Sequence, residues 1–364
     1  MEDTAMETIK RTPFVKELPS TRIERMSRNA ARNSKMEYYF LKMLANGIVK
    51  KRMPPAEIDT LRNRMKRLQG CHKFWLTDTY KESHIKVLLR TYLCKDRFCN
   101  NCSQMRKLVL QNRFLPYLEQ YKDRLYHIVL TVPDCTGEEL KNTIYRMNTC
   151  FKTLVTYLNG NKKVKGLDLT QYGFQGCLRF LEITYRRDMY HPHFHVAAIL
   201  ENGDSLSEKY IVNEFSNRGS QQFSDFEALI QRIWWLLINR KRLTSDNIES
   251  GDDSLGRYSC TADKFQADDY RKLFGYMMKM YGNDRQEMTY DNFKTLYHAL
   301  SRVRQLQGYG VFYNVKEPNI DRYTEADYDM LEHYLTCHEE PVSAYEPLSH
   351  FVGNNGYTLV KSYK

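Results

Sequence analysis

The sequence predicts an α+β protein whose core is an antiparallel β-sheet with helices packed on it. Three short runs have the apolar, β-branched composition of buried strands: residues 126–132, 178–185 and 193–200. Pro133-Asp134 ends the first run, and the polar turn Arg186-Arg187-Asp188 lies between the other two. Two longer runs repeat apolar residues at helical spacing and should cover the sheet: residues 138–158 and 223–240.

Prolines, glycines and changes in polarity along the chain predict the other elements. Residues 36–69 show a helical periodicity that Pro54-Pro55 interrupts. Gly282-Asn283 stops a helix over residues 268–281. The remaining expected elements are a polar, basic arm (1–35), a cysteine-bearing segment (71–102), a polar, acidic loop (245–256), a short strand (257–262), a last helix (291–306) and an acidic tail rich in tyrosine.

Charge and composition limit the class of protein. The 364 residues carry a net charge of +11, and residues 1–70 hold 16 Lys or Arg against 8 Asp or Glu, so +8 lies there. A basic surface favours a polyanionic partner, most commonly nucleic acid. No apolar run approaches the ~20 residues of a membrane span, and the N-terminus lacks the apolar core of a signal peptide. We therefore expect a cytoplasmic protein. Its nine cysteines, an odd number, fit reduced thiols or a metal site better than a disulfide framework.

The stretch from Tyr190 to Val196 carries the clearest candidate metal ligands. His191, His193 and His195 alternate with other residues, although the chain has only ten histidines. Because side chains alternate between the two faces of a strand, the three imidazoles project from one face. Imidazoles grouped in this way form a ligand set for a divalent metal. The alternative is a surface strand that carries several histidines by chance.

A second candidate metal site lies in the cysteine-bearing segment. Cys94, Cys99 and Cys102 combine a C-x-x-C pair with a third thiol ahead of it, and Cys71 lies upstream. Four thiolates around one ion make a closed structural zinc site, so we predict zinc here, with His72 as an alternative to Cys71. Ordinary buried thiols and a redox pair are the competing interpretations, but the βαβ context of a redox pair is absent. The remaining cysteines are expected to be packed thiols: Cys135, Cys150, Cys177, Cys260 and Cys337.

The helix expected over residues 268–281 presents a candidate nucleophile. Lys272, Tyr276 and Lys279 are spaced i, i+4 and i+7, so they share one face. A phenol between two ammonium groups suits a phosphotyrosyl intermediate, because the cations hold a phosphate and favour the phenolate. The alternative is a surface tyrosine that packs between two lysine side chains.

Taken together, these segments resemble the rolling-circle replication initiators of small bacterial plasmids, a branch of the HUH endonuclease superfamily. The strand from Ile128 to Pro133 resembles the first motif of the family, and His191-Pro-His-Phe-His-Val196 resembles its metal motif. Tyr276-Met-Met-Lys279 resembles its Tyr-x-x-Lys nucleophile motif, and the cysteine cluster resembles a knuckle that this branch carries before the first motif. The resemblance spans roughly residues 71–310.

The resemblance implies a fold and a set of metal ligands. The fold is the HUH antiparallel sheet flanked by helices, with a zinc-knuckle insertion and an N-terminal helical region. Glu182 alternates with apolar neighbours, so it should face the histidine side of the sheet, and it also resembles the third-ligand position of HUH nucleases. A carboxylate with the imidazoles of His193 and His195 suits Mn²⁺ or Mg²⁺. His191 either binds the ion too or hydrogen-bonds to a ligand.

The implied activity is metal-dependent, site- and strand-specific nicking and rejoining of plasmid origin DNA, single-stranded, duplex or cruciform, in the bacterial cytoplasm. Tyr276 would form a 5′-phosphotyrosine, and Lys279 would stabilise the phosphoryl oxygens. The implied partners are a host helicase and a DNA polymerase, with a homodimer left open and no membrane. Two alternatives remain: a relaxase or transposase of the same superfamily, and a non-enzymatic, zinc-containing nucleic-acid-binding regulator.

On this basis the chain divides into four expected parts. They are a basic flexible arm (1–35), a helical and zinc-knuckle DNA-binding region (36–120), an HUH endonuclease domain (121–310) and a C-terminal tail (311–364). The first 70 residues and the zinc knuckle are expected to set the affinity for the origin, while the endonuclease domain performs the chemistry.

One position departs from the family pattern. This branch usually has a Glu four residues before the nucleophilic tyrosine, thought to assist the terminating cleavage, and here that position is Lys272. The sequence leaves several candidates for the terminating group: Asp268, Asp269, Tyr270 and Tyr281.

Overall fold

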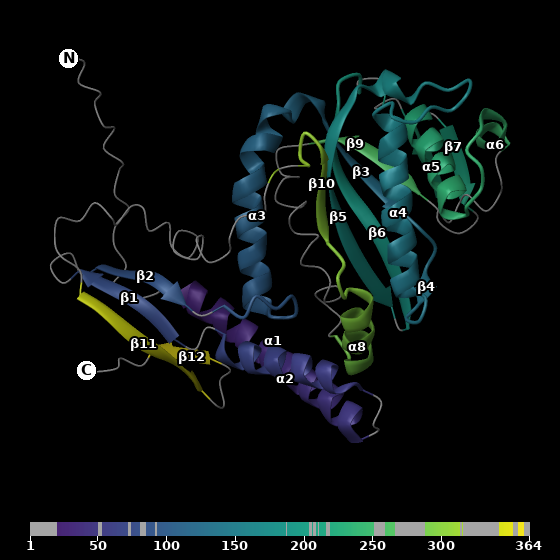
Figure 1. Ribbon diagram of the computed structural model, residues 1–364. Helices are drawn as coiled ribbons and strands as arrows, with labels where there is room; N and C mark the ends of the chain where they lie inside the picture. The colour runs from purple at the N-terminus through teal and green to yellow at the C-terminus, as the bar shows by residue number, and fades with distance from the viewer. Residues whose placement is uncertain are drawn as a thin grey trace, which may run out of the picture. The chain divides into compact units, whose positions relative to one another are not determined.

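The chain forms two compact units in a computed structural model, in which unit 1 comprises Met1–Leu110 with Pro318–Lys364 and unit 2 comprises Gln111–Glu317 (Figure 1). The structure describes residues 20–49, 53–71, 74–80, 85–91, 93–186, 188–203, 206, 209, 211–215, 219–250, 259–265, 288–313, 315, 342–351 and 356–359. Among the helices in these ranges, none is both long and apolar enough to cross a membrane.

Unit 1 combines a helix pair with a four-stranded antiparallel sheet. Its helices are α1 (Ser20–Val49) and α2 (Pro55–Gly70), and the chain leaves the unit within α3 (Asn100–Gln120). Its strands are β1 (Phe74–Tyr80), β2 (Ile85–Thr91), β11 (Val342–Phe351) and β12 (Gly356–Leu359), in the order β12-β11-β1-β2. Two strands from the C-terminal tail therefore complete a sheet that begins near the cysteines.

The helix pair of unit 1 packs through a narrow apolar face. Phe40 of α1 and Leu61 and Leu68 of α2 are buried. Pro55 begins α2, where the fixed φ of proline suits the first helical turn. The ring of Phe40 also meets the edge of Phe98 at 6.4 Å between centroids, so α1 is joined to the loop between Cys94 and Cys99.

Unit 2 is built on an antiparallel sheet in the order β10-β5-β6-β3-β9. The strands are β3 (Leu125–Thr131), β5 (Phe174–Arg186), β6 (Met189–Leu200), β9 (Cys260–Lys264) and β10 (Leu306–Gly310). The short β4 (Cys135–Thr136) also pairs with β6, and β7 (Ile211–Phe215) pairs with β8 (Gly219–Phe223) as a separate hairpin. The histidine strand β6 therefore lies in the centre of the sheet.

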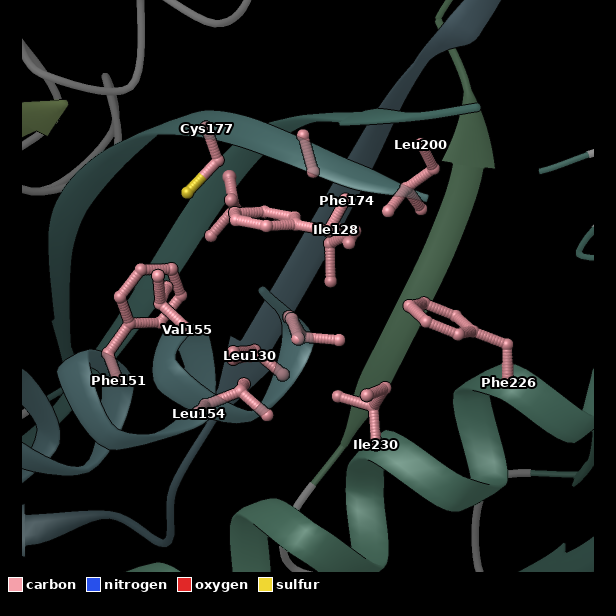
Figure 2. A pocket seen from close by; sticks show the side chains of 13 residues that line it. Ile128, Leu130, Phe151, Leu154, Val155, Phe174, Cys177, Leu200, Phe226 and Ile230 are labelled. Atoms are coloured by element: carbon pink, nitrogen blue, oxygen red, sulfur yellow. The ribbon is translucent and has the colours of Figure 1, made fainter. Parts of the chain in front are cut away.

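Two long helices cover one face of this sheet: α4 (Leu140–Leu158) and α5 (Asp225–Ile238). The register places Ile128 beside Val196 and Leu130 beside Phe194, so these four side chains share the covered face. Apolar side chains from both helices meet them around a small cavity (Figure 2). Shorter elements complete the unit: η1 (Lys122–Arg124), η2 (Leu169–Tyr172), α6 (Ser245–Glu249) and α8 (Tyr290–Ala299).

Glu227 ties α5 to the edge of the sheet. The residue is fully buried and forms a capping box, in which its Oε2 accepts the backbone N–H of Ser224 at 2.8 Å. Its Oε1 accepts the backbone N–H of Ala262 in β9 at 2.6 Å and the ammonium of Lys209 at 3.0 Å. One carboxylate thus satisfies an outward-facing amide of an edge strand, which is a group that otherwise invites pairing with another chain.

Replacing Glu227 with alanine is expected to destabilise unit 2 by about 2–4 kcal/mol. The change leaves the buried amide of Ala262 without its acceptor and removes half of a capping box. The free energy of unfolding in urea would measure the effect. Glu138→Ala, which removes an exposed carboxylate ahead of α4, should change that free energy by less than about 0.5 kcal/mol. Equal stability of the two variants would contradict the expectation.

The α+β prediction is confirmed, and most predicted elements match the structure. The strands expected at 126–132, 178–185 and 193–200 are β3, β5 and β6, and the helices expected at 138–158 and 223–240 are α4 and α5. The strand expected at 257–262 is β9, displaced toward the C-terminus. The helix expected at 268–281 lies outside the described residues.

Several elements differ from the expectation, each for a local reason. α1 begins at Ser20, ahead of the helical periodicity predicted from residue 36, since Ile23, Met26 and Ala30 extend the helical spacing toward the N-terminus. The last helix ends at Ala299 rather than 306, and β10 follows it. In the sequence the two glycines of β10 are typical of a turn. In the structure Gly310 has φ +59°, and a β-carbon at this position would clash with the carbonyl oxygen of Gln175. The short α6 lies in the expected acidic loop, and β1, β2, β11 and β12 lie in the cysteine-bearing segment and the tail, for which no helix or strand was predicted.

Candidate metal centres

Strand pairing brings Glu182, His193 and His195 together on the sheet face opposite α4 and α5. Glu182 of β5 pairs directly with His193 of β6, and Thr131 of β3 pairs with His193 from the other side. Leu181 pairs with Phe194 on the helix-covered face. Since side chains alternate, Glu182 lies on the histidine face, where the parity of the sequence predicts it.

The three side chains converge on one point. Oε2 of Glu182 lies 2.7 Å from Nε2 of His193 and 2.6 Å from Nε2 of His195. All three residues are buried, and their ligand atoms lie within 4.8 Å of one another. One carboxylate oxygen and two imidazole nitrogens in this arrangement could hold a divalent metal ion.

The electrostatics of the group also suit a cation. Burial alone raises the pKa of Glu182, but hydrogen bonds with His193 and His195 outweigh it and lower the pKa to about 2. The carboxylate is therefore ionised at neutral pH although it is buried. A buried anion with two imidazoles aimed at it is a donor set that a divalent ion would complete.

His191 is not part of this convergent group and hydrogen-bonds to another residue, although its ring centroid lies 5.2 Å from that of His193. Its Nδ1 lies 2.8 Å from Oδ1 of Asp134, which follows β3, and both side chains are partly exposed. Its backbone carbonyl lies 3.1 Å from Nδ1 of His193. A carbonyl only accepts hydrogen bonds, so Nδ1 of His193 donates to it, and Nε2 is the ring atom that lies toward Glu182. The main chain of His191 thus orients a candidate ligand.

His127 is a further histidine at this centre, and no motif in the sequence points to it. Its Nε2 lies 3.0 Å from Nδ1 of His195, and the two rings stack with centroids 5.2 Å apart. The signal available in the sequence was period-two alternation, since His127 has the same parity as Val129 and Thr131 of the strand. That parity alone did not tell which face of β3 lies toward the histidines of β6.

A second centre lies in unit 1, where Cys71, Cys94, Cys99 and Cys102 form one buried group. The sulfur atoms of Cys71 and Cys102 lie 3.5 Å apart, as do those of Cys94 and Cys102, and those of Cys99 and Cys71 lie 3.6 Å apart. The cysteines are free thiols. Four thiolate ligands at about 2.3 Å in a tetrahedron are about 3.8 Å apart, so the spacing of the sulfurs fits a single bound metal ion.

The chemistry around the sulfurs also fits bound metal. Hydrogen bonds with the thiols of Cys102, Cys94 and Cys99, and then burial, raise the pKa of Cys71. Without a cation the thiol of Cys71 therefore keeps its proton. Backbone N–H groups of Cys94, Asp96 and Cys102 each donate to a sulfur at 3.5 Å, which would help to hold thiolates around an ion.

The helix pair of unit 1 supports the loop that carries these cysteines. Nδ2 of Asn33 in α1 donates to Sγ of Cys99 at 3.4 Å, and its Oδ1 accepts the backbone N–H of Asn100 at 2.8 Å. Arg64 of α2 forms a two-point ion pair with the buried Asp96, at 2.7 and 3.0 Å. The cysteine loop and the two helices therefore make one structural unit, of which Cys71 at the end of α2 is part.

The remaining predicted site residues are either buried cysteines elsewhere in the described ranges or lie outside the described residues. Tyr276, Lys279, Lys272 and His72 lie outside the described residues. The same holds for the candidates for the terminating group: Asp268, Asp269, Tyr270 and Tyr281. Cys135, Cys150, Cys177 and Cys260 are buried free thiols, as expected of packed cysteines, and burial raises the pKa of each. Cys337 also lies outside the described residues.

Comparisons with known proteins connect these centres to a family. Residues 85–214 match the family described as Replication protein, and this stretch contains Glu182, the histidines of β6 and three of the four clustered cysteines. No solved structure matches the chain.

Individual relatives point in the same direction. A Protein rep of Staphylococcus aureus is 30% identical over 158 residues, which cover 42% of this chain and 65% of the relative. A Protein rep of a Bacillus species is 33% identical over 136 residues (36% of this chain, 41% of the relative), and one of Bacillus amyloliquefaciens is 34% identical over 136 residues (36% and 37%). The matched region thus spans less than two thirds of each of these relatives. Residues 85–214 are therefore similar to replication proteins, in agreement with the predicted resemblance to rolling-circle plasmid replication initiators.

Proposed function

We propose that the chain initiates rolling-circle replication of a plasmid by nicking and rejoining one DNA strand at the origin. The observation that carries the proposal is the buried group of Glu182, His193 and His195 inside the stretch that matches replication proteins. A carboxylate and two imidazoles can hold a divalent ion for phosphoryl transfer, and a replication protein has a DNA phosphate on which to act.

Glu182, His193 and His195 would hold the divalent ion, Mn²⁺ or Mg²⁺. When bound, the ion supplies positive charge that polarises the scissile phosphate and offsets the charge that develops on it. The chain keeps Glu182 of β5 ionised and presents both Nε2 atoms from the adjacent strand β6 of a packed sheet, so little reorganisation is needed at the moment of reaction.

Tyr276 supplies the nucleophile in this proposal. Its phenolic oxygen attacks the phosphorus, the bond to the 3′-oxygen breaks, and that oxygen takes up the phenolic proton. The products are a 5′-phosphotyrosine and a free 3′-hydroxyl, which primes synthesis. Lys279 would stabilise the non-bridging oxygens. A reverse transesterification later closes the displaced strand.

A covalent-capture experiment tests the proposal. The full-length protein is incubated with Mn²⁺ and labelled single-stranded oligonucleotides that tile the plasmid carrying its gene, and the products are separated on a denaturing gel. We expect one strand of one segment to yield a cleaved product and an SDS-stable protein–DNA adduct. Binding without cleavage of any segment would refute the proposal in favour of a non-enzymatic regulator. Cleavage confined to transfer-origin or transposon-end sequences would instead identify a relaxase or transposase.

The cluster of Cys71, Cys94, Cys99 and Cys102 is proposed to hold one structural zinc ion. We expect metal analysis of protein purified without chelator to give about one zinc per chain, because four buried thiols at this spacing match a closed zinc site. Cys99→Ser should lose the zinc, whereas Cys150→Ser, which changes a buried thiol outside the cluster, should retain it. Zinc-free wild-type protein would contradict this assignment.

Unit 1 is proposed to bind duplex origin DNA through its basic helices. Deleting residues 1–70 would also remove Asn33 and Arg64, which support the cysteine loop, so point changes are the cleaner test. Lys66→Gln with Arg67→Gln neutralises two exposed cations of α2. We expect the slope of log K against log salt to become less negative by about 0.9 for each lost phosphate contact. Lys152→Gln in unit 2 is the control, and an unchanged slope in the double variant would contradict the idea.

The proposed role also defines the partners. Single-stranded DNA reaches the catalytic centre, duplex or cruciform origin DNA is bound by unit 1, and a host helicase and DNA polymerase extend the 3′-hydroxyl. A homodimer remains a prediction that the oligomeric state in solution would test.

A further inference from the structure

His127 lies beside the Glu182 centre but has no part in the reaction described above. It belongs to β3, one strand away from the histidines, on the same face of the sheet. Its Nε2 lies 3.0 Å from Nδ1 of His195. The two rings are nearly parallel, with an angle of 15° between their planes, so His195 is both stacked on His127 and hydrogen-bonded to it.

The position of His127 follows from the register of the sheet. It pairs with Ala197 of β6, and Val129 pairs with His195, so His127 and His195 are diagonal neighbours on one face. The buried Ala197 has a small side chain, which leaves room for the imidazole to lean toward His195. On its other side the ring of Phe265 packs edge-on against His127 at 5.7 Å between centroids.

The two candidate ligands of β6 are oriented at Nδ1 by different groups. For His193 the group is the carbonyl oxygen of His191, at 3.1 Å, and for His195 it is the ring of His127. A histidine that binds a metal through Nε2 must carry its proton on Nδ1 and donate it to an acceptor. A carbonyl always meets this need, whereas an imidazole nitrogen meets it only as the unprotonated acceptor.

We propose that His127 is a positioning residue for His195. Its Nε2 accepts the Nδ1–H of His195, which sets the tautomer and the ring plane that leave Nε2 of His195 to the metal. The inference rests on the proposed function, because it requires a divalent ion held by Glu182, His193 and His195. His127 acts through His195, so its removal should weaken metal binding by the 10–100-fold that is typical of groups that support a ligand.

Three substitutions separate hydrogen bonding from packing. His127→Phe keeps an aromatic ring for stacking but has no acceptor. His127→Gln places a carbonyl oxygen three bonds from the β-carbon, as Nε2 of histidine is. His127→Asn places its carbonyl oxygen nearer the backbone, at the position of Nδ1, and is the matched control for polarity. The readout is the affinity of the full-length protein for Mn²⁺ alone, measured by isothermal titration calorimetry, with thermal unfolding to show that each variant is folded.

We expect His127→Phe and His127→Asn to bind Mn²⁺ about 10–100-fold more weakly than wild type, and His127→Gln to recover most of the loss. Wild-type affinity in His127→Phe would overturn the role of His127 while leaving the metal centre intact. Equal losses in the Gln and Asn variants would also overturn it, because they would point to packing alone. A wild-type protein that takes up no Mn²⁺ would instead overturn the metal centre of the proposed function, and this role with it.

Discussion

A chain in which His193 and His195 are both replaced by alanine is expected to lose metal-dependent nicking altogether. The change leaves Glu182 as the last member of the described group, and one carboxylate holds a divalent ion weakly. The measurement is cleavage of the single-stranded origin segment in Mn²⁺, together with calorimetric affinity for Mn²⁺. Glu182→Ala alone should lower that affinity by about 10–100-fold.

One control and one further variant show whether the effect is specific to His193 and His195. His298→Ala removes an exposed histidine of α8 and should leave both cleavage and affinity unchanged. His191→Ala tests whether its side chain, which lies against Asp134, also binds the ion. If the double variant is folded and still cleaves at the wild-type rate in EDTA, the metal mechanism is wrong.

Tyr276→Phe is expected to abolish the covalent protein–DNA adduct while leaving DNA binding nearly unchanged. Only the nucleophilic oxygen is lost, and the aromatic ring is retained. The adduct is measured as an SDS-stable band with labelled DNA, and binding is measured by gel shift in the same buffer. The two activities should therefore separate completely in this variant.

Neighbouring tyrosines provide the matched controls for this result. Tyr270→Phe and Tyr281→Phe should still form the adduct, although either could fail to release it if that tyrosine serves in termination in place of the usual Glu. An adduct that persists in Tyr276→Phe would show that another tyrosine is the nucleophile. In that case the tyrosine motif assigned by resemblance would be wrong.

The parts of the fold that the sequence predicted are those with a strong local period. β3, β6 and α4 each repeat apolar residues at the spacing of their own geometry, and each was located within a few residues. β10 and the tail strands were missed because glycine-rich or polar segments become strands only by pairing with a distant partner. β11, for example, pairs with β1 across more than half of the chain.

The candidate centres divide in the same way. The sequence by itself determined that His193 and His195 share a face and that Cys94, Cys99 and Cys102 can reach one ion, because both follow from spacing within a few residues. It also indicated the face of Glu182, since alternation with buried neighbours has only two outcomes.

Only the tertiary structure decided that Cys71 completes the thiol group and that His127 lies against His195. It also decided that Glu227 accepts the backbone N–H of Ala262 at the edge of β9. Each of these contacts joins segments that are distant in sequence, so each depends on strand register or helix packing. Such contacts are set by how whole elements pack together, and no local period or motif encodes them.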